Sequence, residues 1–134
     1  MLDHSLDELL LAHLKTVPAL AALHGYTGQD NAEHKLPALT ISTTSEPLAG
    51  SDTDFRGEVG VIVESEAHYT TAATHGERVE AVRATLASRA AVIAALNATG
   101  RLHIYGYAPL GTEPTAGDAR FATKLRYRFG FGPA

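Results

Sequence analysis

Residues 120–131 read Arg-Phe-Ala-Thr-Lys-Leu-Arg-Tyr-Arg-Phe-Gly-Phe, and the character of the side chains alternates along them. One set is mainly apolar: Phe121, Thr123, Leu125, Tyr127, Phe129 and Phe131. The other set is basic: Arg120, Lys124, Arg126 and Arg128. Because successive side chains of a β-strand point to opposite faces, this period of two predicts a strand with one face in the core and the basic face outside.

Three other segments show similar alternation and are predicted to be strands. Residues 38–45 alternate Leu39, Ile41 and Thr43 with small hydroxyl side chains, and the β-branched residues favour a half-buried strand. Residues 55–64 place Phe55, Gly57, Val59, Val61 and Val63 on one side, with Arg56, Glu58, Gly60, Ile62 and Glu64 on the other. Over residues 102–107, Leu102, Ile104 and Gly106 alternate with His103, Tyr105 and Tyr107, which predicts a strand that ends at Pro109.

The spacing of apolar residues changes to three and four in two places, which predicts helices. One helix is expected over about 6–16, after a capping box at Ser5 and Glu8, with a short helical turn at 18–23. The other covers about 74–97, with a possible capping box at Thr74 and Glu77 and stop signals at Asn97 and Gly100. Its apolar stripe is Val79, Val82, Leu86, Ala90, Ile93 and Leu96.

These elements predict an α+β fold in the order αββαββ. We expect one domain over residues 1–134, with a mostly antiparallel sheet of about four strands and two helices packed on one face. The connecting loops are expected at about 24–37, 46–54, 65–73 and 109–119. Three of them, 24–37, 46–54 and 109–119, are rich in Gly, Pro or polar residues, and we expect them to become ordered only against partners.

The composition excludes several classes of protein. A length of 134 residues with 45% hydrophobic residues suits a single globular domain. The absence of cysteine rules out disulfide scaffolds, thiol catalysis and thiolate zinc sites. No apolar run is long enough to span a bilayer, and Met1–His4 lacks the layout of a signal peptide. We therefore expect a protein that is made in the cytosol and does not associate with a membrane.

Charge is distributed unevenly along the chain. Through Glu66 there are eleven acidic and three basic side chains, a net −8, and from Ala67 onward there are four and eight, a net +4. Opposite patches of this kind can steer copies of one chain together head to tail. The alternative is that the two halves fold together and their charges interleave on one surface.

The sequence contains no recognisable catalytic or metal-binding motif. Its seven histidines show no H-E-x-x-H spacing; His68 and His75 are seven residues apart, and His13 lies on an apolar stripe. The side chains of Glu64 and Glu66 would lie on the same face of a strand, as a catalytic pair of carboxylates would require. The alternative interpretation is a solvated strand end. No G-x-S-x-G sequence and no phosphate-binding glycine loop occurs. We predict no enzymatic activity, no cofactor and no metal.

The basic stripe allows three interpretations: a solvated strand face, a protein contact, or a contact with a phosphate backbone. If such faces meet in neighbouring copies, charges of opposite sign would set their orientation. We therefore predict an assembly interface in which basic residues of the last strand face acidic residues of the earlier one. The basic members are Arg120, Lys124, Arg126 and Arg128, and the acidic members are Glu58, Glu64 and Glu66.

Particular stretches, together with the order of elements, resemble a known family. They are Asp54–Val59 (Asp-Phe-Arg-Gly-Glu-Val), His75–Arg83, Leu102–Tyr107 and Tyr127–Phe131, besides the short N-terminal helix. Across nearly the whole chain the sequence looks like the small tail-terminator or tail-completion proteins of long-tailed phages and prophages, which are also described as minor tail proteins. That family has no catalytic motif to carry over.

The resemblance implies a homo-oligomeric ring, usually of six subunits, at the head-proximal end of a phage tail tube. The ring would stop tube polymerisation and offer a surface to head-completion and connector proteins. The partners would be other copies, the tail tube protein and the neck proteins, with DNA passing through the lumen without sequence-specific binding. The protein would then reside in the virion, after synthesis in the bacterial host cytoplasm.

Three alternatives remain at this point. A head-closure or connector protein of the neck has a similar size and plan. A small ligand-binding domain would show a closed apolar pocket and a stable monomer. An enzyme would show a deep pocket lined by His68, His75 or His103.

Overall fold

The central pairing of the sheet joins β3 (Phe55–Glu66) to β5 (Arg120–Gly132). The two strands are antiparallel, from Phe55 opposite Phe131 to Glu66 opposite Arg120. This register sets Val59 against Tyr127 on the core side, so the alternation predicted for both strands is confirmed. The computed structural model describes residues 2–28, 35–51, 53–67, 70–114 and 120–134.

The sheet has five strands in the order β1-β2-β3-β5-β4. β2 (Ala38–Pro47) and β4 (His103–Pro114) each pair antiparallel with a central strand, whereas β1 (His24–Thr27) runs parallel to β2. The predicted α+β class is confirmed, but the sheet is mixed and has one strand more than predicted.

The additional strand, β1, lies in the segment that the sequence predicted as a loop. A Cβ atom on Gly25 would come 3.0 Å from Leu11 Cδ2, so the missing side chain lets the strand lie close to helix α1 without displacing Leu11. Glycine therefore permits close packing here, although in sequence it is usually a sign of a turn. Residues 29–34 of the same predicted loop lie outside the described residues.

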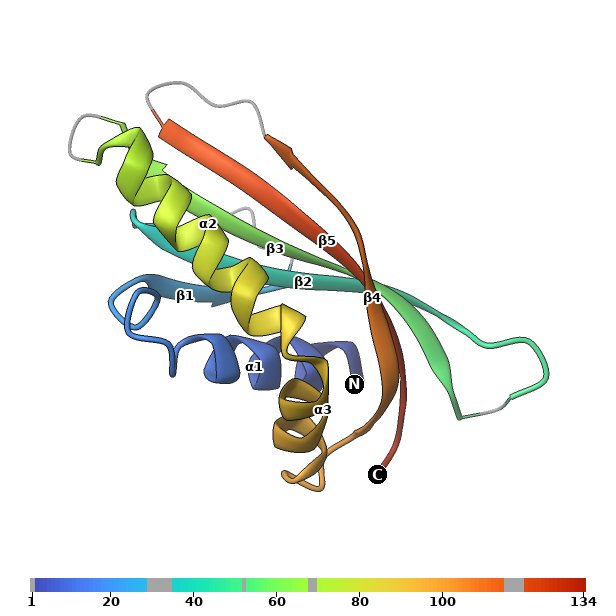
Figure 1. Ribbon diagram of the computed structural model, residues 1–134. Coiled ribbons are helices and arrows are strands. Elements are labelled where there is room, and N and C mark those ends of the chain that lie inside the picture. The colour runs from blue at the N-terminus through green and yellow to red at the C-terminus, as the bar shows by residue number, and fades with distance from the viewer. Residues whose placement is uncertain (1, 29–34, 52, 68–69, 115–119) are drawn as a thin grey trace.

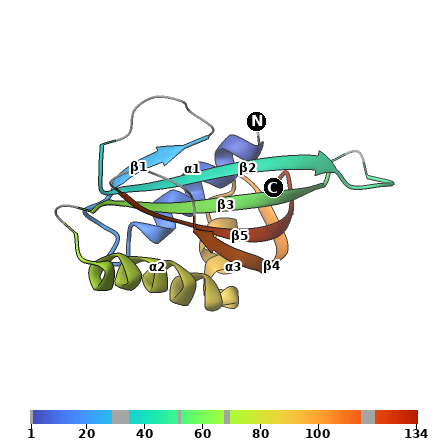
Figure 2. The ribbon, with the colours of Figure 1, turned by 90° about the horizontal axis from the view of Figure 1, so that it is seen from above.

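Three helices pack on one face of the sheet (Figures 1 and 2). They are α1 (Leu2–Leu14), α2 (Ala72–Ala87) and α3 (Arg89–Asn97), so the order is αβββααββ. Their fully or nearly fully buried side chains are Leu6, Leu10, Leu14, Val79, Val82, Leu86, Val92 and Leu96. These meet a layer formed by the sheet: Leu39, Ile41, Val59, Val61, Val63, Leu125, Phe129 and Phe131. No described helix is long and apolar enough to cross a membrane.

The long helix predicted over 74–97 is in fact two helices. Ser88 adopts φ −80° and ψ 66°, which ends α2 and separates it from α3. The break leaves the Leu86 carbonyl to accept a hydrogen bond from the Tyr107 hydroxyl at 2.7 Å. The apolar spacing continues across the break, so the sequence pattern does not reveal it. The N-cap is Thr71, whose hydroxyl accepts from the Thr74 N–H at 3.1 Å, and not Thr74 as predicted.

The first helix also differs from its prediction. It begins at Leu2, four residues earlier than expected, so Ser5 lies inside the helix and its hydroxyl accepts from Arg101 Nη2 at 3.3 Å. It ends at Leu14, and turns follow it, closed by backbone bonds from Leu20 to Val17 and from Leu23 to Leu20. The predicted short helical turn is therefore a pair of turns.

Strand β4 passes the predicted stop at Pro109 and continues to Pro114. Its register shifts between Ile104 and Gly106 and again between Pro109 and Gly111. A bulge places an extra residue in one strand and changes the face to which later side chains point. Tyr107 therefore turns into the core, stacked on Phe129 at 4.6 Å between ring centroids, whereas Tyr105 stays 54% exposed. The predicted sharing of one face by these two tyrosines is wrong. Residues 115–119 lie outside the described residues.

Two carboxylates fix α1 onto β2. Asp7 Oδ1 accepts a hydrogen bond from the Thr43 hydroxyl, and Asp3 Oδ1 accepts one from the Ser45 hydroxyl, each at 2.5 Å. Asp3 and Asp7 are four residues apart, so both point from the same side of the helix. Asp7 is buried, and burial raises its pKa to about 6, against the opposing effect of the Thr43 bond. A charged Asp7 therefore weakens the folded state at neutral pH.

We predict that Asp7→Asn raises the free energy of unfolding at pH 7 by about 1–3 kcal/mol, from about 1.4 kcal/mol per unit of pKa difference. The raised pKa means that Asp7 supports folding fully below its unfolded value of 3.8 and loses that support as the pH rises through about 6. The increase in the free energy of unfolding caused by Asp7→Asn should therefore be much smaller at pH 3.5. Urea unfolding of both chains at the two pH values measures it, with Asp3→Asn as the control. An equal effect at both pH values would contradict the prediction.

Candidate functional site

The face of the sheet opposite the helices carries the charged residues that the sequence singled out. Antiparallel register sets Glu58 opposite Arg128, and Glu66 opposite Arg120. All seven predicted interface residues therefore lie on this one face, which we call the open face, on two neighbouring strands of one chain. They are Glu58, Glu64, Glu66, Arg120, Lys124, Arg126 and Arg128.

Several of these charges pair within the chain. Arg126 Nε lies 2.5 Å from Glu58 Oε1, and Arg120 Nη1 lies 2.7 Å from Glu64 Oε2. The hydrogen bond from Arg126 lowers the pKa of Glu58 below its ordinary value, so the pair stays charged at neutral pH. The interleaving of charges, left open by the sequence, is thus present in the single chain. Pairing between copies is not tested by a single chain and stays a prediction.

Two cations of the open face, Lys124 and Arg128, form no ion pair with a described residue, although both lie near enough to Glu58 to help lower its pKa. The Lys124 side chain lies flat over Gly60, where a Cβ atom would come 2.7 Å from Lys124 Cε. Its methylenes therefore cover the strand backbone and its ammonium group remains on the surface. The face is consequently a mixed-charge surface with two cationic groups outside its ion pairs, which suits contact with a polar partner surface.

Shallow hollows on the open face are polar. One of about 240 Å³ is bordered by Thr44, Glu46, Arg56 and Arg128, and one of about 120 Å³ by Ser42, Glu58 and Lys124. Small-molecule sites are usually deeper and mainly apolar. The open face is therefore better suited to a protein partner than to a small ligand.

The histidines that the structure describes are placed apart from one another. His75 is buried between α2 and the sheet, with Nδ1 2.9 Å from Ser65 Oγ and Nε2 3.0 Å from Thr123 Oγ1. Burial, and next the nearby Arg78, lower its pKa, so the neutral form joins α2 to β3 and β5. His103 packs edge to face against Tyr105, with ring centroids 4.7 Å apart. His68 lies outside the described residues. Among described residues, no three His, Asp or Glu side chains gather in a way that could hold a metal.

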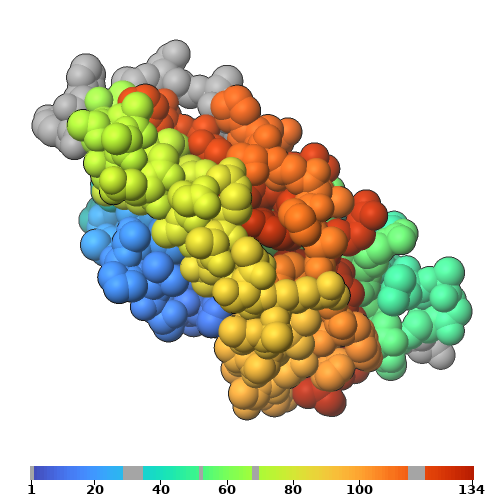
Figure 3. Space-filling model, viewed as in Figure 1, coloured from blue at the N-terminus to red at the C-terminus, as the bar shows by residue number. Residues whose placement is uncertain are grey.

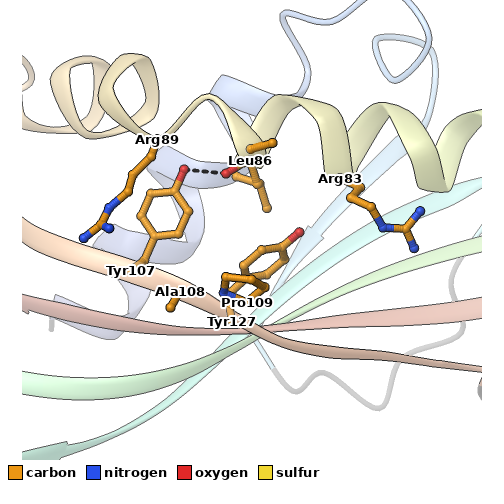
Figure 4. Close-up of a pocket in the computed structure, with 8 residues that line it drawn as sticks. Arg83, Leu86, Arg89, Tyr107, Ala108, Pro109 and Tyr127 are labelled. Atoms are coloured by element: carbon orange, nitrogen blue, oxygen red, sulfur yellow. Dashed lines mark hydrogen bonds between the residues drawn. The ribbon is translucent and has the colours of Figure 1, made fainter.

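A second feature, which the sequence did not predict, is a cavity of about 260 Å³ where α2 meets α3 (Figure 4). We call it the junction pocket. Its walls are Leu86, Ala87, Tyr107, Ala108, Pro109 and Tyr127, and two arginines, Arg83 and Arg89, border it. Burial raises the pKa of Tyr107 to about 12 and also raises that of Tyr127, so both phenols are neutral at pH 7. Neither the helix break nor the β4 bulge that forms the pocket has a local sequence signal.

Comparison with known proteins gives a likeness of fold. No protein-family model matches the sequence, and no curated protein matches it. Among solved structures, a chain of the virion of the native gene transfer agent particle has a similar fold, with a TM-score of 0.62 and 17% sequence identity. The match covers 95% of this chain and 94% of the other. The two chains therefore share a fold along their whole length.

We predict that Arg128→Glu, alone or with Arg126→Glu, weakens assembly but changes the thermal midpoint little. Both side chains lie on the open face, and their only ionic contact in the described structure is the exposed Arg126–Glu58 pair. Such exposed pairs add little stability. Light scattering for assembly and calorimetry for the midpoint measure the two effects, with Lys15→Glu as a charge reversal away from this face. Unfolding of the Arg128→Glu chain would show that the face is internal and overturn the prediction.

Proposed function

We propose that this protein is a structural component of a phage-like virion. In this proposal it forms a ring of six copies at the head-proximal end of a tail tube, ends polymerisation of the tube and provides the surface for head-tail joining. It acts without catalysis, cofactor or metal, and DNA passes through the ring without sequence-specific binding. Its partners are other copies, the tail tube protein and the head-completion or connector proteins.

The observation that carries the proposal is the likeness to a chain of the gene transfer agent virion. That likeness extends over 95% of this chain, so it concerns the complete arrangement of helices and strands and not a common local motif. Folds host many functions, so the likeness supports a virion role only together with other features. The stretches that resemble tail-terminator proteins provide a second and independent support.

The architecture supports assembly as well. Figure 2 shows the three helices on one face of the sheet and no described element over the other. Charged and hydroxyl residues of β2, β3 and β5 lie on that other face. When a patch on one copy binds a different patch on the next copy, the repeated contact forms a closed ring if the rotation between neighbours adds up to a full turn. A polar, wet contact of this kind suits a ring that assembles on a template, because the free subunit stays soluble.

Head closure is the second candidate, since it is also a structural role in a virion and the fold likeness does not separate the two. Both candidates place the protein in the virion at the junction of head and tail. The two candidate functions predict different particles when the protein is absent, and this difference decides between them.

We predict that deletion of the gene from its source element gives overlong tails without heads, because tube growth has no stop. Electron microscopy of the particles measures tail length, with the wild-type gene supplied in trans as the control. Tails of normal length beside unjoined heads would instead support head closure. Particles unchanged in shape and yield would contradict any structural role in the virion.

A further inference from the structure

Three arginines border one hollow at the β4 edge of the open face. The hollow has a volume of about 300 Å³, and its charged lining residues are Arg56, Arg89 and Arg128. No described acidic residue lines it. The polar hollow beside it, which shares Arg56 and Arg128, is in contrast bordered by Glu46 and Glu58. Positive charge is therefore concentrated in the first hollow, which we call the arginine hollow.

Two glycines leave the floor of the arginine hollow without side chains. Gly106 of β4 lies opposite Gly130 of β5, and Gly130 in turn lies opposite Arg56 of β3. Cross-strand partners point to the same face of a sheet, so a side chain at either glycine would enter the hollow. A Cβ atom on Gly130 would meet no atom beyond its chain neighbours closer than 4.0 Å. The floor is thus bare backbone that a larger residue could cover.

Gly106 also lets Arg89 reach the hollow from the helix side of the sheet. Arg89 is the first residue of α3, and Figure 4 shows its side chain running past the Tyr107 ring toward β4. Its Nη2 lies 2.6 Å from the position that a Cβ atom on Gly106 would take. The guanidinium group therefore occupies the space of the missing side chain, close to the arginines of β3 and β5.

Two of the three guanidinium groups form no ion pair with a described residue. They are those of Arg89 and Arg128, although Arg128 lies near enough to Glu58 to help lower its pKa. Arg56 pairs with Glu46 at 3.1 Å, and both side chains are more than half exposed. Exposed pairs of this kind add little stability, so Arg56 can exchange its partner at low cost. The hollow can therefore donate several charge-assisted hydrogen bonds to one anion.

The rest of the lining favours a carboxylate that belongs to a protein segment. Its walls include Ala108 and Leu48, which comes from the arm between β2 and β3 that stands out from the body (Figures 1 and 3). Apolar walls fit a side chain whose carboxylate follows apolar atoms, and arginine binds carboxylates with two parallel hydrogen bonds. A nucleic-acid backbone would need a continuous basic track, whereas Glu46 and Glu58 lie directly beside this hollow.

The described acids of the chain itself do not form a segment that could fill the hollow of a second copy. Five already belong to ion pairs: Glu8, Glu46, Glu58, Glu64 and Glu80. Three others accept hydrogen bonds from side chains: Asp3, Asp7 and Asp54. The remaining three lie on three different elements: Glu66 on β3, Glu77 on α2 and Glu113 on β4. An acidic segment is therefore better supplied by a different protein.

We propose that the arginine hollow binds an acidic segment of a neighbouring virion protein, a different chain from this one. Arg89 and Arg128 bind a side-chain carboxylate of that segment, Arg56 adds a third cation, and apolar atoms of the segment lie over Gly106 and Gly130. This inference rests on the proposed function, because it names the chemistry of a partner at the junction of head and tail.

Fluorescence anisotropy with a synthetic probe tests the site. The probe is a labelled peptide in which glutamates alternate with leucines, and its control carries glutamine in place of each glutamate. We expect the acidic peptide to bind at least about tenfold more tightly than its control, because each carboxylate gains charge-assisted hydrogen bonds. Equal affinity for the two peptides, or no binding of either, would overturn the proposal.

A charge substitution tests the arginines. Arg89→Gln should weaken binding of the acidic peptide at least about fivefold, because it removes a cation that no described acid neutralises. Its matched control is Arg101→Gln, which removes the same charge from an exposed arginine that does not line the hollow. This control should change the affinity by less than about twofold. Equal effects of the two substitutions would count against the site.

A substitution in the floor tests the shape of the hollow. Gly130→Val keeps all three arginines but fills the floor, so it should weaken binding of the acidic peptide several-fold. The fold tolerates the change because a Cβ atom meets no close atom there and β-branched residues suit a strand. An unchanged thermal midpoint checks this. Peptide binding that Gly130→Val leaves as tight as in the wild type would contradict the proposed position of the segment.

Two further measurements test other occupants. A short DNA duplex should bind more weakly than the acidic peptide, and tighter binding of the duplex would assign the hollow to nucleic acid and overturn the proposal. Light scattering should show the same self-association for Arg89→Gln as for the wild type. A loss of self-association would assign the hollow to a second copy of the chain and would also overturn it.

The peptide experiment and the composition of particles separate this inference from the proposed function. If the chain is present in purified particles but does not bind the acidic peptide, the site is wrong and the virion role stands. If the chain binds the peptide through Arg89 but is absent from the particles, the proposed function fails and the carboxylate site stands.

Discussion

The pairing of β3 with β5 is the constraint on which the other features depend. Its register sets Val61 against Leu125 on one face, and Glu58 against Arg128 on the other. A shift of one residue would turn the valines to solvent and bring arginines beneath the helices. The antiparallel register therefore determines both where α1, α2 and α3 pack and where the charges gather. The open face is a direct consequence of the same pattern that forms the core.

This division of the sheet explains why the structure supports assembly better than chemistry. Among the described residues, the histidines that a catalyst could use are dispersed: His75 is enclosed between α2 and the sheet, and His103 packs edge to face against an exposed tyrosine. The charged groups instead lie along a broad surface. A surface of alternating charges gives orientation to a contact more than it gives affinity. Such a surface suits a subunit that joins its neighbours at one particular place on a growing particle.

The sequence predicted those parts of the fold that depend on local periodicity, and it missed the parts set by distant contacts. β2, β3 and β5 were predicted because their alternation is itself the signal. β1 was missed because a glycine such as Gly25 indicates a turn in sequence, whereas its packing against Leu11 is visible only in the fold. The break at Ser88 was missed because the apolar stripe continues across it. The sequence placed the seven predicted interface residues on the outer faces of their strands, but their pairing within the chain required the register, and their role as an interface stays a prediction. The junction pocket had no sequence signal.

The central claim is that the open face and its charges are an assembly surface of a virion. A high-resolution electron cryomicroscopy map of purified particles from the source element tests it most directly. The account predicts a closed ring of this chain at the junction of head and tail, with Lys124 and Arg128 of each copy in contact with another protein chain. A ring whose open faces meet only solvent, or particles without this chain, would contradict it.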